Sequence, residues 1–344
     1  MSVKGAILLF MSMLLVQITA QEKQEASYSI FGYVRGWHET DLANNSSEFK
    51  VVMSRLGIKG KLSEKLSYGL FVDFSRLGKL STTSEDVNGN EVVTNVSASF
   101  SDYLLDAYAA IKPISGLSVQ LGQFKVPFST ENLTSASAIP FVNRSLVRTY
   151  TSPGLRDIGG MVTFENKTSL PVTINFGLFN GSGQNKTEDD YTTNYAARIV
   201  AAPVTDVKVS ANYYGGTAKG IETSYWNIGA EYVNSGLSAA AEFGGKKSNL
   251  PTTDKTAFSY FLYALYDFHI ESDLVPIIQP GLRFDSADPD NNIDNNEVKR
   301  ITVGLAFILT QKKQTHIRVN YEKYDMADGS TAPDKLILEF QLRF

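Results

Sequence analysis

The chain has 344 residues, of which 43% are hydrophobic and 11% aromatic, and its formal net charge is −4. It contains no cysteine, which excludes disulfide bonds, thiolate metal sites and lipidation at a cysteine. The slightly acidic balance gives no indication of nucleic-acid binding, so we expect no nucleic-acid partner, no cofactor and no metal site.

The first twenty residues have the features of a secretory signal peptide. Lys4 precedes an apolar stretch at residues 6–16, and the small residue Ala20 stands before a charged segment. The apolar stretch is too short for a comfortable membrane span. We therefore predict export, with a signal peptide at residues 1–20 and a mature domain at residues 21–344. Removing the signal peptide takes away one lysine, which leaves 31 basic against 36 acidic residues and a net charge of −5.

The rest of the chain reads as a succession of short strands. No apolar run after the signal peptide reaches the ~18 to 20 residues of a membrane helix. Segments of alternating apolar and polar residues, rich in Tyr, Phe, Val and Ile, are separated instead by Gly, Asn, Asp and Pro. We count sixteen such segments, at residues 28–37, 49–60, 66–75, 102–112, 116–124, 157–166, 171–180, 193–202, 206–216, 223–233, 236–246, 258–268, 275–284, 298–309, 316–325 and 335–344.

The predicted connections alternate in length. Brief ones such as residues 203–205 take turns with longer, polar ones such as residues 286–297. An even number of strands of about ten residues, with short turns at one rim and long loops at the other, is typical of an outer-membrane barrel. We therefore predict an all-β fold, a transmembrane antiparallel β-barrel of about 16 strands. Its sheet must close, because each unpaired edge group in hydrocarbon would cost several kcal/mol.

The final strand shows the alternation most clearly. Glu339, Gln341 and Arg343 separate apolar residues at every second position, namely Leu336, Leu338, Phe340, Leu342 and Phe344. In a barrel the apolar face contacts outer-membrane lipid and the polar face contacts water. A terminal aromatic residue on the lipid face resembles the signal that the bacterial barrel-assembly machinery recognises, so we predict Phe344 as the assembly signal.

Alternation also assigns charged residues to the interior face. The inward acids are Asp73, Asp106, Glu231, Glu242, Glu322 and Glu339, and Arg343 is an inward cation. The two signs nearly balance, and for most of these residues we favour a solvated wall with mutual salt bridges. The cations predicted for the pore wall are Arg55, Lys59, Arg198, Arg283 and Arg318.

The third long connection, residues 126–156, carries the most specific sequence, and loops of this length are usually functional. The stretch GQFKVPFSTE enters it at residues 122–131, Arg144 lies inside it, and PGLRDIGG leaves it at residues 153–160. These motifs resemble the phosphate-selective porin family, porins O and P. The resemblance implies a homotrimer of sixteen-stranded barrels, each with a third outer loop that folds inward and narrows the pore.

Cations outnumber acids at this loop. Glu131 and Asp157 are the acids close in sequence to four cations, which are Lys125, Arg144, Arg148 and Arg156. At a narrow, low-dielectric constriction a few unpaired charges outweigh many distant ones. Arg144 and Arg148 either face the pore, where Arg suits bidentate binding of phosphate or carboxylate, or attach the loop to Glu131 and to acids of the wall. We predict a constriction and anion pathway formed by Lys125, Arg144, Arg148, Arg156 and Glu131.

These features predict a water-filled channel for passive diffusion of small hydrophilic solutes and ions, with a mild preference for anions such as phosphate. Two other classes compete with it. An enzyme would need a catalytic constellation, but His38, His269 and His316 fall on different predicted strands, and neither G-x-S-x-G nor H-E-x-x-H occurs. An adhesin or surface-binding barrel without a transport role would carry exposed aromatic residues on long outer loops, and these loops are polar.

Overall fold

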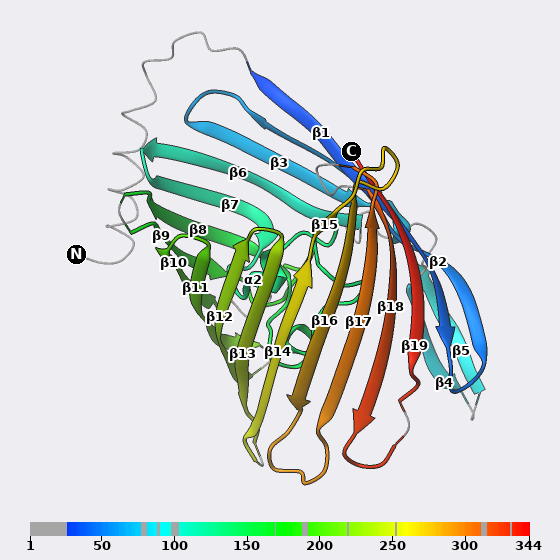
Figure 1. The fold of residues 1–344 in the computed structure, drawn as a ribbon. Coiled ribbons are helices and arrows are strands. Elements are labelled where there is room, and N and C mark those ends of the chain that lie inside the picture. The colour runs from blue at the N-terminus through cyan, green and yellow to red at the C-terminus, as the bar shows by residue number, and fades with distance from the viewer. Residues whose placement is uncertain are drawn as a thin grey trace.

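The computed structural model describes residues 26–76, 81–87, 90–97, 103–168, 170–187, 192–218, 220–251, 253–310, 315–330 and 332–344. The predicted signal peptide lies outside the described residues. Within them, sixteen antiparallel strands form one closed sheet, which confirms the predicted barrel (Figure 1). Each of the sixteen segments predicted from the sequence coincides with one of these strands.

The bounds of the barrel strands follow the alternating segments closely. In chain order they are β1 (Ser27–Asp41), β2 (Ser46–Lys61), β3 (Leu66–Asp73), β6 (Leu104–Ile114), β7 (Leu117–Lys125), β8 (Arg156–Asn166), β9 (Val172–Phe179), β10 (Asn194–Val204), β11 (Val207–Ala218), β12 (Ile221–Asn234), β13 (Leu237–Asn249), β14 (Lys255–Tyr266), β16 (Ile277–Asp288), β17 (Val298–Ile308), β18 (His316–Met326) and β19 (Lys335–Arg343).

The remaining described elements are short. The two-residue strand β15 (Phe268–His269) follows β14 and pairs with β16. In the connection between β3 and β6, β4 (Ser81–Val87) and β5 (Asn90–Ser97) pair with each other in a separate two-stranded sheet. The helical pieces are η1 (Phe74–Arg76), α2 (Thr130–Leu133) and α3 (Leu146–Tyr150). Among the described residues, no helix has both the length and the apolar character needed to cross a membrane.

The barrel closes where the last strand meets the first. β19 pairs with β1 as well as with β18. At this seam the amide of Phe344 donates to the carbonyl oxygen of Gly32 at 3.0 Å, and the amide of Gly32 donates to that of Phe344 at 3.1 Å. A Cβ atom at position 32 would lie 2.5 Å from the Arg55 carbonyl oxygen and 2.8 Å from the Phe344 ring. Glycine is therefore the residue that fits this seam.

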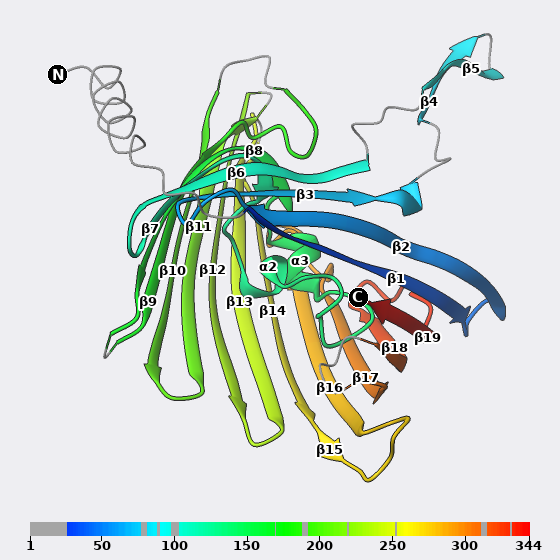
Figure 2. The ribbon, with the colours of Figure 1, turned by 90° about the horizontal axis from the view of Figure 1, so that it is seen from above.

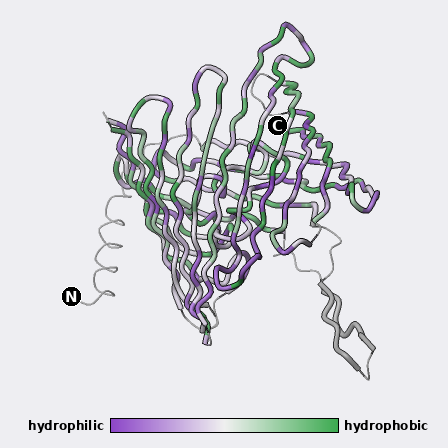
Figure 3. The backbone as a smooth tube through the Cα atoms, turned by 60° about the horizontal axis from the view of Figure 1, so that its bottom comes forward, coloured by the Kyte–Doolittle hydropathy of each residue, from purple (hydrophilic) through white to green (hydrophobic). Residues whose placement is uncertain are grey.

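The two faces of the sheet differ as the alternation predicts. On β19, the side chains of Leu336, Leu338, Phe340 and Leu342 are 42–48% exposed. Their neighbours Ile337, Glu339 and Gln341 are 0% exposed, because these face the interior. Figure 3 shows the same alternation of hydrophobic and hydrophilic residues along many strands. An apolar outer surface and a polar inner one suit lipid outside and water inside.

Candidate functional site

The connection at residues 126–155, which joins β7 to β8, is called here the third-loop segment. Figure 2 shows its two helices, α2 and α3, within the curve of the barrel strands. Its first turn is held by apolar packing, in a buried cluster made up of Phe124, Val126, Phe128, Phe179, Ala196 and Tyr214. Three of these come from the sequence FKVPF, whose apolar residues thus fix where the segment leaves the wall.

A wall carboxylate fixes the beginning of α2. Glu242 on β13 is 4% exposed, and its oxygens accept hydrogen bonds from Ser129 Oγ at 2.6 Å, from the Glu131 amide at 2.9 Å and from Asn227 Nδ2 at 3.0 Å. Ser129 has a φ of +60°, a left-handed backbone conformation that is uncommon for residues other than glycine. The bond to Glu242 holds Ser129 in this conformation.

Two of the predicted anion-pathway cations bond to the end of α2. Lys125 Nζ donates to the carbonyl oxygens of residues 132–134 at 2.8–3.0 Å. Arg144 donates to the carbonyl oxygen of Glu131, and at 2.8 Å to that of Thr134. The last carbonyl groups of a helix lack partners within the helix, so these cations satisfy them. Their partners are neutral, and neither positive charge is cancelled by an ion pair in the described part of the chain.

Arg148, on α3, has one weak partner. Its Nη1 donates to the Pro153 carbonyl oxygen at 3.3 Å, and among the described residues it forms no ion pair. Burial lowers the pKa of the Arg148 guanidinium from its usual value, because desolvation disfavours the charged form. The negative charge of the nearby Glu131 opposes this effect in part.

The other two predicted residues of the constriction are Glu131 and Arg156, and both have structural partners. Glu131 connects the two helices of the segment, and Arg156 connects two barrel strands. Glu131 is 9% exposed and accepts hydrogen bonds from Ser145, from its amide at 2.9 Å and from its Oγ at 2.6 Å. This joins α2 to the start of α3. Arg156, at the start of β8, forms a two-point ion pair with Asp106 on β6, with N–O distances of 2.8 and 3.2 Å. Its charge is therefore neutralised locally.

Four buried arginines of the strands, here called the basic wall, face the third-loop segment: Arg35, Arg283, Arg300 and Arg318. Arg35 on β1 donates to the carbonyl oxygens of Ala136 and Val142, both at 3.0 Å. Arg318 on β18 donates to that of Ile139 at 2.8 Å.

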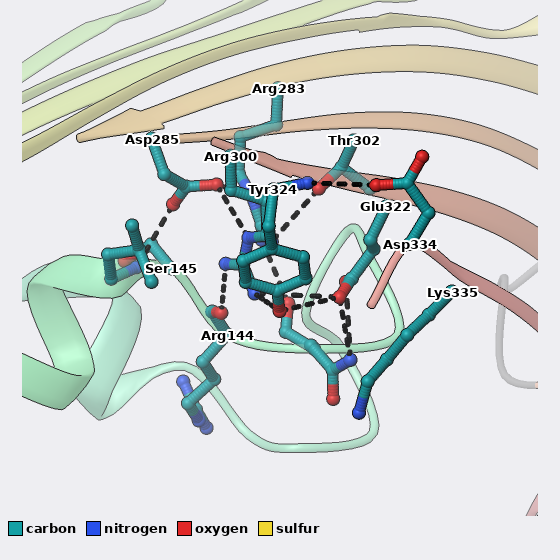
Figure 4. A network of polar contacts seen from close by, with 12 residues as sticks. Arg144, Ser145, Arg283, Asp285, Arg300, Thr302, Glu322, Tyr324, Asp334 and Lys335 are labelled. Atoms are coloured by element: carbon teal, nitrogen blue, oxygen red, sulfur yellow. Dashed lines mark hydrogen bonds and ion pairs between the residues drawn. The ribbon is translucent and has the colours of Figure 1, made fainter. Parts of the chain in front are cut away.

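The other two arginines continue the row toward α3. Arg283 on β16 donates to the carbonyl oxygen of Asn143 at 2.8 Å, and Arg300 on β17 donates to that of Arg144 at 2.6 Å (Figure 4). The basic wall thus binds the backbone of residues 136–144 along most of its length. These contacts to backbone carbonyls fix the path of the segment.

Three buried carboxylates, on β16, β18 and β19, pair with the four arginines of the basic wall. Glu339 pairs with Arg35, and with Arg318 Nη2 at 2.5 Å. Asp285 pairs with Arg283 at 2.8 Å and with Arg300 at 3.1 Å. Glu322 lies 3.6 Å from Arg300 (Figure 4). It also accepts a hydrogen bond from Asn143 Nδ2 at 3.2 Å. All three acids are 0% exposed, so three buried carboxylates compensate most of the charge of the four guanidinium groups.

The remaining predicted wall cations differ in their surroundings. Arg55 pairs with Asp73 at 2.7 Å. Arg198 donates to Asn212 Oδ1 at 2.5 Å and to Thr130 Oγ1 at 2.9 Å, so it too contacts the third-loop segment. Lys59 is exposed, with its Nζ 5.5 Å from the centre of the Phe31 ring. Arg198 therefore joins the attachment of the segment, whereas Arg55 and Lys59 belong to the wall of β2.

The sequence matches the family model of the phosphate-selective porins O and P over residues 34–269. The chain belongs to this porin family. The resemblance drawn from the loop motifs is thereby confirmed. As a porin, the chain forms a channel of the bacterial outer membrane. No curated protein matches it in sequence.

The porin barrel is similar to several solved structures. An anion-selective porin from Comamonas acidovorans is 15% identical, with a TM-score of 0.63 over 93% of this chain and 100% of that one. OmpT from Vibrio cholerae, in its trimer form, is 10% identical, with a TM-score of 0.62 over 93% of this chain and 100% of that one. The channel DcaP of Acinetobacter baumannii is 12% identical, with a TM-score of 0.59 over 94% of this chain and 99% of that one. At these identities the likeness shows the fold.

Two arginines of the porin's basic wall, Arg35 and Arg300, are not among the residues singled out from the sequence. The sequence nevertheless contains a pattern that places both of them inside the barrel. Arg35 stands two residues after the inward Tyr33, and Arg300 stands two residues before the inward Thr302. Strict alternation therefore places both guanidinium groups inside. Their contact with the third-loop segment has no such signal, because it is made to backbone carbonyls.

The histidines of the porin lie apart in the described structure. His316 is buried on β18, with Nε2 3.1 Å from Glu339 Oε1. His38 packs against Phe49, with ring centres 4.4 Å apart, and His269 is exposed in β15. Among the described residues no cluster of three or more metal-ligating side chains is present. His38 and His316 thus each pack or bond within the wall, at different places in the barrel.

Proposed function

We propose that this porin is a passive channel for small hydrophilic solutes and ions, that the third-loop segment narrows it, and that the segment gives it a mild preference for small anions. The contacts between this segment and the basic wall support the proposed narrowing, because they place the backbone of the segment against inward-facing side chains. The sign of the selectivity follows from how the charges are paired.

The observation that carries the preference is the difference between two sets of cations. Each arginine of the basic wall pairs with a buried carboxylate. Arg144 and Arg148 bond to backbone carbonyls, and among the described residues neither forms an ion pair. Glu131 is the one acid of the segment at this point, so the balance is positive. In a narrow, low-dielectric passage these few charges dominate the potential that an ion experiences.

Weak binding is part of this function. Conduction requires an anion to leave as readily as it enters, so several weak sites suit a channel better than one tight site. The family name and the anion-selective porin from Comamonas acidovorans favour phosphate and other small anions as the solutes. We propose small anions as the preferred class and phosphate as one member of it.

The reversal potential of single channels in planar bilayers under a KCl gradient tests the sign of the selectivity. Arg148 is the residue to change, because it makes one weak backbone contact, whereas Arg144 also holds α2. We expect Arg148→Gln to reduce the anion preference and Arg148→Glu to reverse it, with conductance largely kept. Lys247→Glu is the control, because that exposed lysine pairs with Asp254 at 2.8 Å. Unchanged potentials in both Arg148 variants would contradict the proposal.

We further propose that residues 1–20 direct export, that Phe344 is recognised by the barrel-assembly machinery, and that the mature porin is a homotrimer. The first follows from the sequence pattern. The second is supported by the exposed Phe344 side chain on the lipid face beside the barrel seam. The third is supported by family membership and by the trimer form of OmpT.

A further inference from the structure

A cavity of about 340 Å³ lies between the third-loop segment and the strand wall from β12 to β19. Residues between 130 and 140 of the segment line one side of it. Val233 and Ser238 also line it, and these two residues flank the short turn between β12 and β13. The cavity is therefore on the short-turn side of the segment. It is large enough for an aromatic ring, since an apolar cavity of about 150 Å³ already holds benzene.

Part of the inner wall at this cavity is apolar, although the inside of a porin barrel is usually polar. Strands β14 and β17 each contribute two apolar side chains, and the segment contributes two more. These side chains are Phe261, Leu265, Ala306 and Ile308 of the wall and Ile139 and Pro140 of the segment. An apolar group that enters the cavity leaves water for this lining, which is favourable.

A cation with an uncommitted charge lines the same cavity. Arg343 on β19 is partly exposed and, among the described residues, takes part in no ion pair. Arg318 on β18 also lines the cavity, but it pairs with Glu339. Glu339 is 0% exposed and pairs with Arg35 as well, so this acid is already committed. Arg343 therefore keeps a positive charge for a solute.

Arg343 and Ile308 are close enough for one small solute to contact both. Their strands, β19 and β17, are separated by β18 alone. Ile308 lies opposite His316, and His316 lies opposite Gln341, two residues before Arg343. Strands about 4.8 Å apart, with about 3.4 Å per residue along each, put the two Cα atoms roughly 12 Å from each other. Both side chains line the cavity, so the gap between their ends suits an anion with a single ring.

The acids that line the cavity lie away from this corner. They are Glu231 on β12, Glu242 on β13 and Glu131 of the segment. In the order of the sheet, β14, β16, β17 and β18 separate β13 from β19. A negatively charged group is therefore favoured at the Arg343 end of the cavity.

We propose that the corner between Ile308 and Arg343 is a subsite for small organic anions of the aromatic carboxylate and sulfonate class. The anionic group lies at Arg343, and the ring lies against Ala306 and Ile308. The proposal rests on the channel function proposed above and adds a solute class to it. An inorganic anion gains from Arg343 alone, whereas an aromatic anion gains from the apolar wall as well. The contribution of a partly exposed charge is small, which suits a site that a solute must also leave.

Block of the single-channel chloride current in planar bilayers tests this subsite in the reconstituted mature porin. Potassium benzenesulfonate and potassium methanesulfonate carry the same anionic group, and the former also carries a ring. We expect benzenesulfonate to halve the wild-type current at a roughly tenfold lower concentration, as for partial burial of one aromatic ring. Equal half-blocking concentrations of the two anions would overturn the subsite.

Single variants separate the two halves of the subsite. Ile308→Thr should reduce the preference for benzenesulfonate roughly fourfold, because apolar contact equivalent to about one methylene group is lost. Val298→Thr is the matched control, because Val298 is a buried residue at the long-loop end of the same strand, where it packs in a cluster with Leu146. It should keep the preference. Arg343→Gln should weaken block by both anions and leave their ratio unchanged.

Ala306→Ser repeats the apolar test with a smaller change in volume, so the test does not depend on the assembly of one variant. An unchanged ratio in both Ile308→Thr and Ala306→Ser would overturn the subsite, as would unchanged block in Arg343→Gln. A wild-type chloride current without the preference for benzenesulfonate overturns the subsite and leaves the channel function standing. Absence of any wild-type current contradicts the channel function and the subsite together.

Discussion

Arg318 on β18 and Glu339 on β19 lie directly opposite each other in the strand register, and Arg318 Nη2 is 2.5 Å from Glu339 Oε1. The same arginine donates to the carbonyl oxygen of Ile139. One buried ion pair therefore connects the closing strands of the barrel to the third-loop segment. Its loss would affect both the wall and the segment.

We expect Glu339→Gln to destabilise the barrel. Arg35 and Arg318 would keep their charges inside the wall without their carboxylate, and breaking a buried pair in this way costs roughly 3–5 kcal/mol. The urea midpoint of unfolding in detergent micelles measures the loss. Glu48→Gln is the control, because Glu48 is a 62%-exposed partner of Lys50, and such pairs contribute about 0–1 kcal/mol. Equal midpoints for the two variants would contradict a structural role of Glu339.

We expect Lys125→Met to loosen α2 with little effect on the barrel. The variant leaves the carbonyl oxygens of residues 132 and 133 without their donor, whereas that of Thr134 keeps Arg144; unsatisfied buried groups of this kind cost roughly 1–3 kcal/mol. Hydrogen exchange of residues 130–136 should speed up, and the open-channel current should become noisier. Lys167→Met changes a lysine that is 84% exposed and should alter neither. Unchanged exchange in Lys125→Met would show that Arg144 suffices to hold α2.

We expect deletion of Phe344 to impair assembly more than Phe344→Ala does. Deletion removes both backbone hydrogen bonds with Gly32 at the seam together with the aromatic ring, whereas the alanine variant loses the ring alone. Phe344→Tyr keeps both and should assemble normally. The measurement is the yield of heat-modifiable protein in the outer-membrane fraction. A full yield from the deletion variant would contradict the assembly role of Phe344.

We expect the mature porin in mild detergent to have three times the mass of one chain. Light scattering with correction for bound detergent, or native mass spectrometry, measures it directly. The proposed trimer derives from the family and from OmpT, and no contact in the single chain depends on it. A monomer mass at several protein concentrations would contradict the trimer and leave the channel proposal standing.

The sequence alone determined the barrel. Apolar and polar residues alternate along each strand, as Leu338 and Glu339 do, and successive side chains of a strand point to opposite faces. Alternation therefore fixes which side chains meet lipid and which meet water, and the lengths of the connections fix which rim is which. The loop motifs around Lys125 and Arg156 also sufficed to indicate the porin family. These are local properties, which a single sequence expresses directly.

Only the tertiary structure decided what the charged residues do. Arg35 and Glu339 are 304 positions apart, and barrel closure brings them together. The arginines of the basic wall bind the segment through backbone carbonyl oxygens, which every residue possesses, so no side-chain pattern marks them. Likewise, Arg144 supports α2 while Arg148 keeps its charge largely uncommitted, although the two residues look equivalent in sequence. The difference arises because the path of the segment, set by contacts with distant strands, determines which carbonyl group each guanidinium reaches.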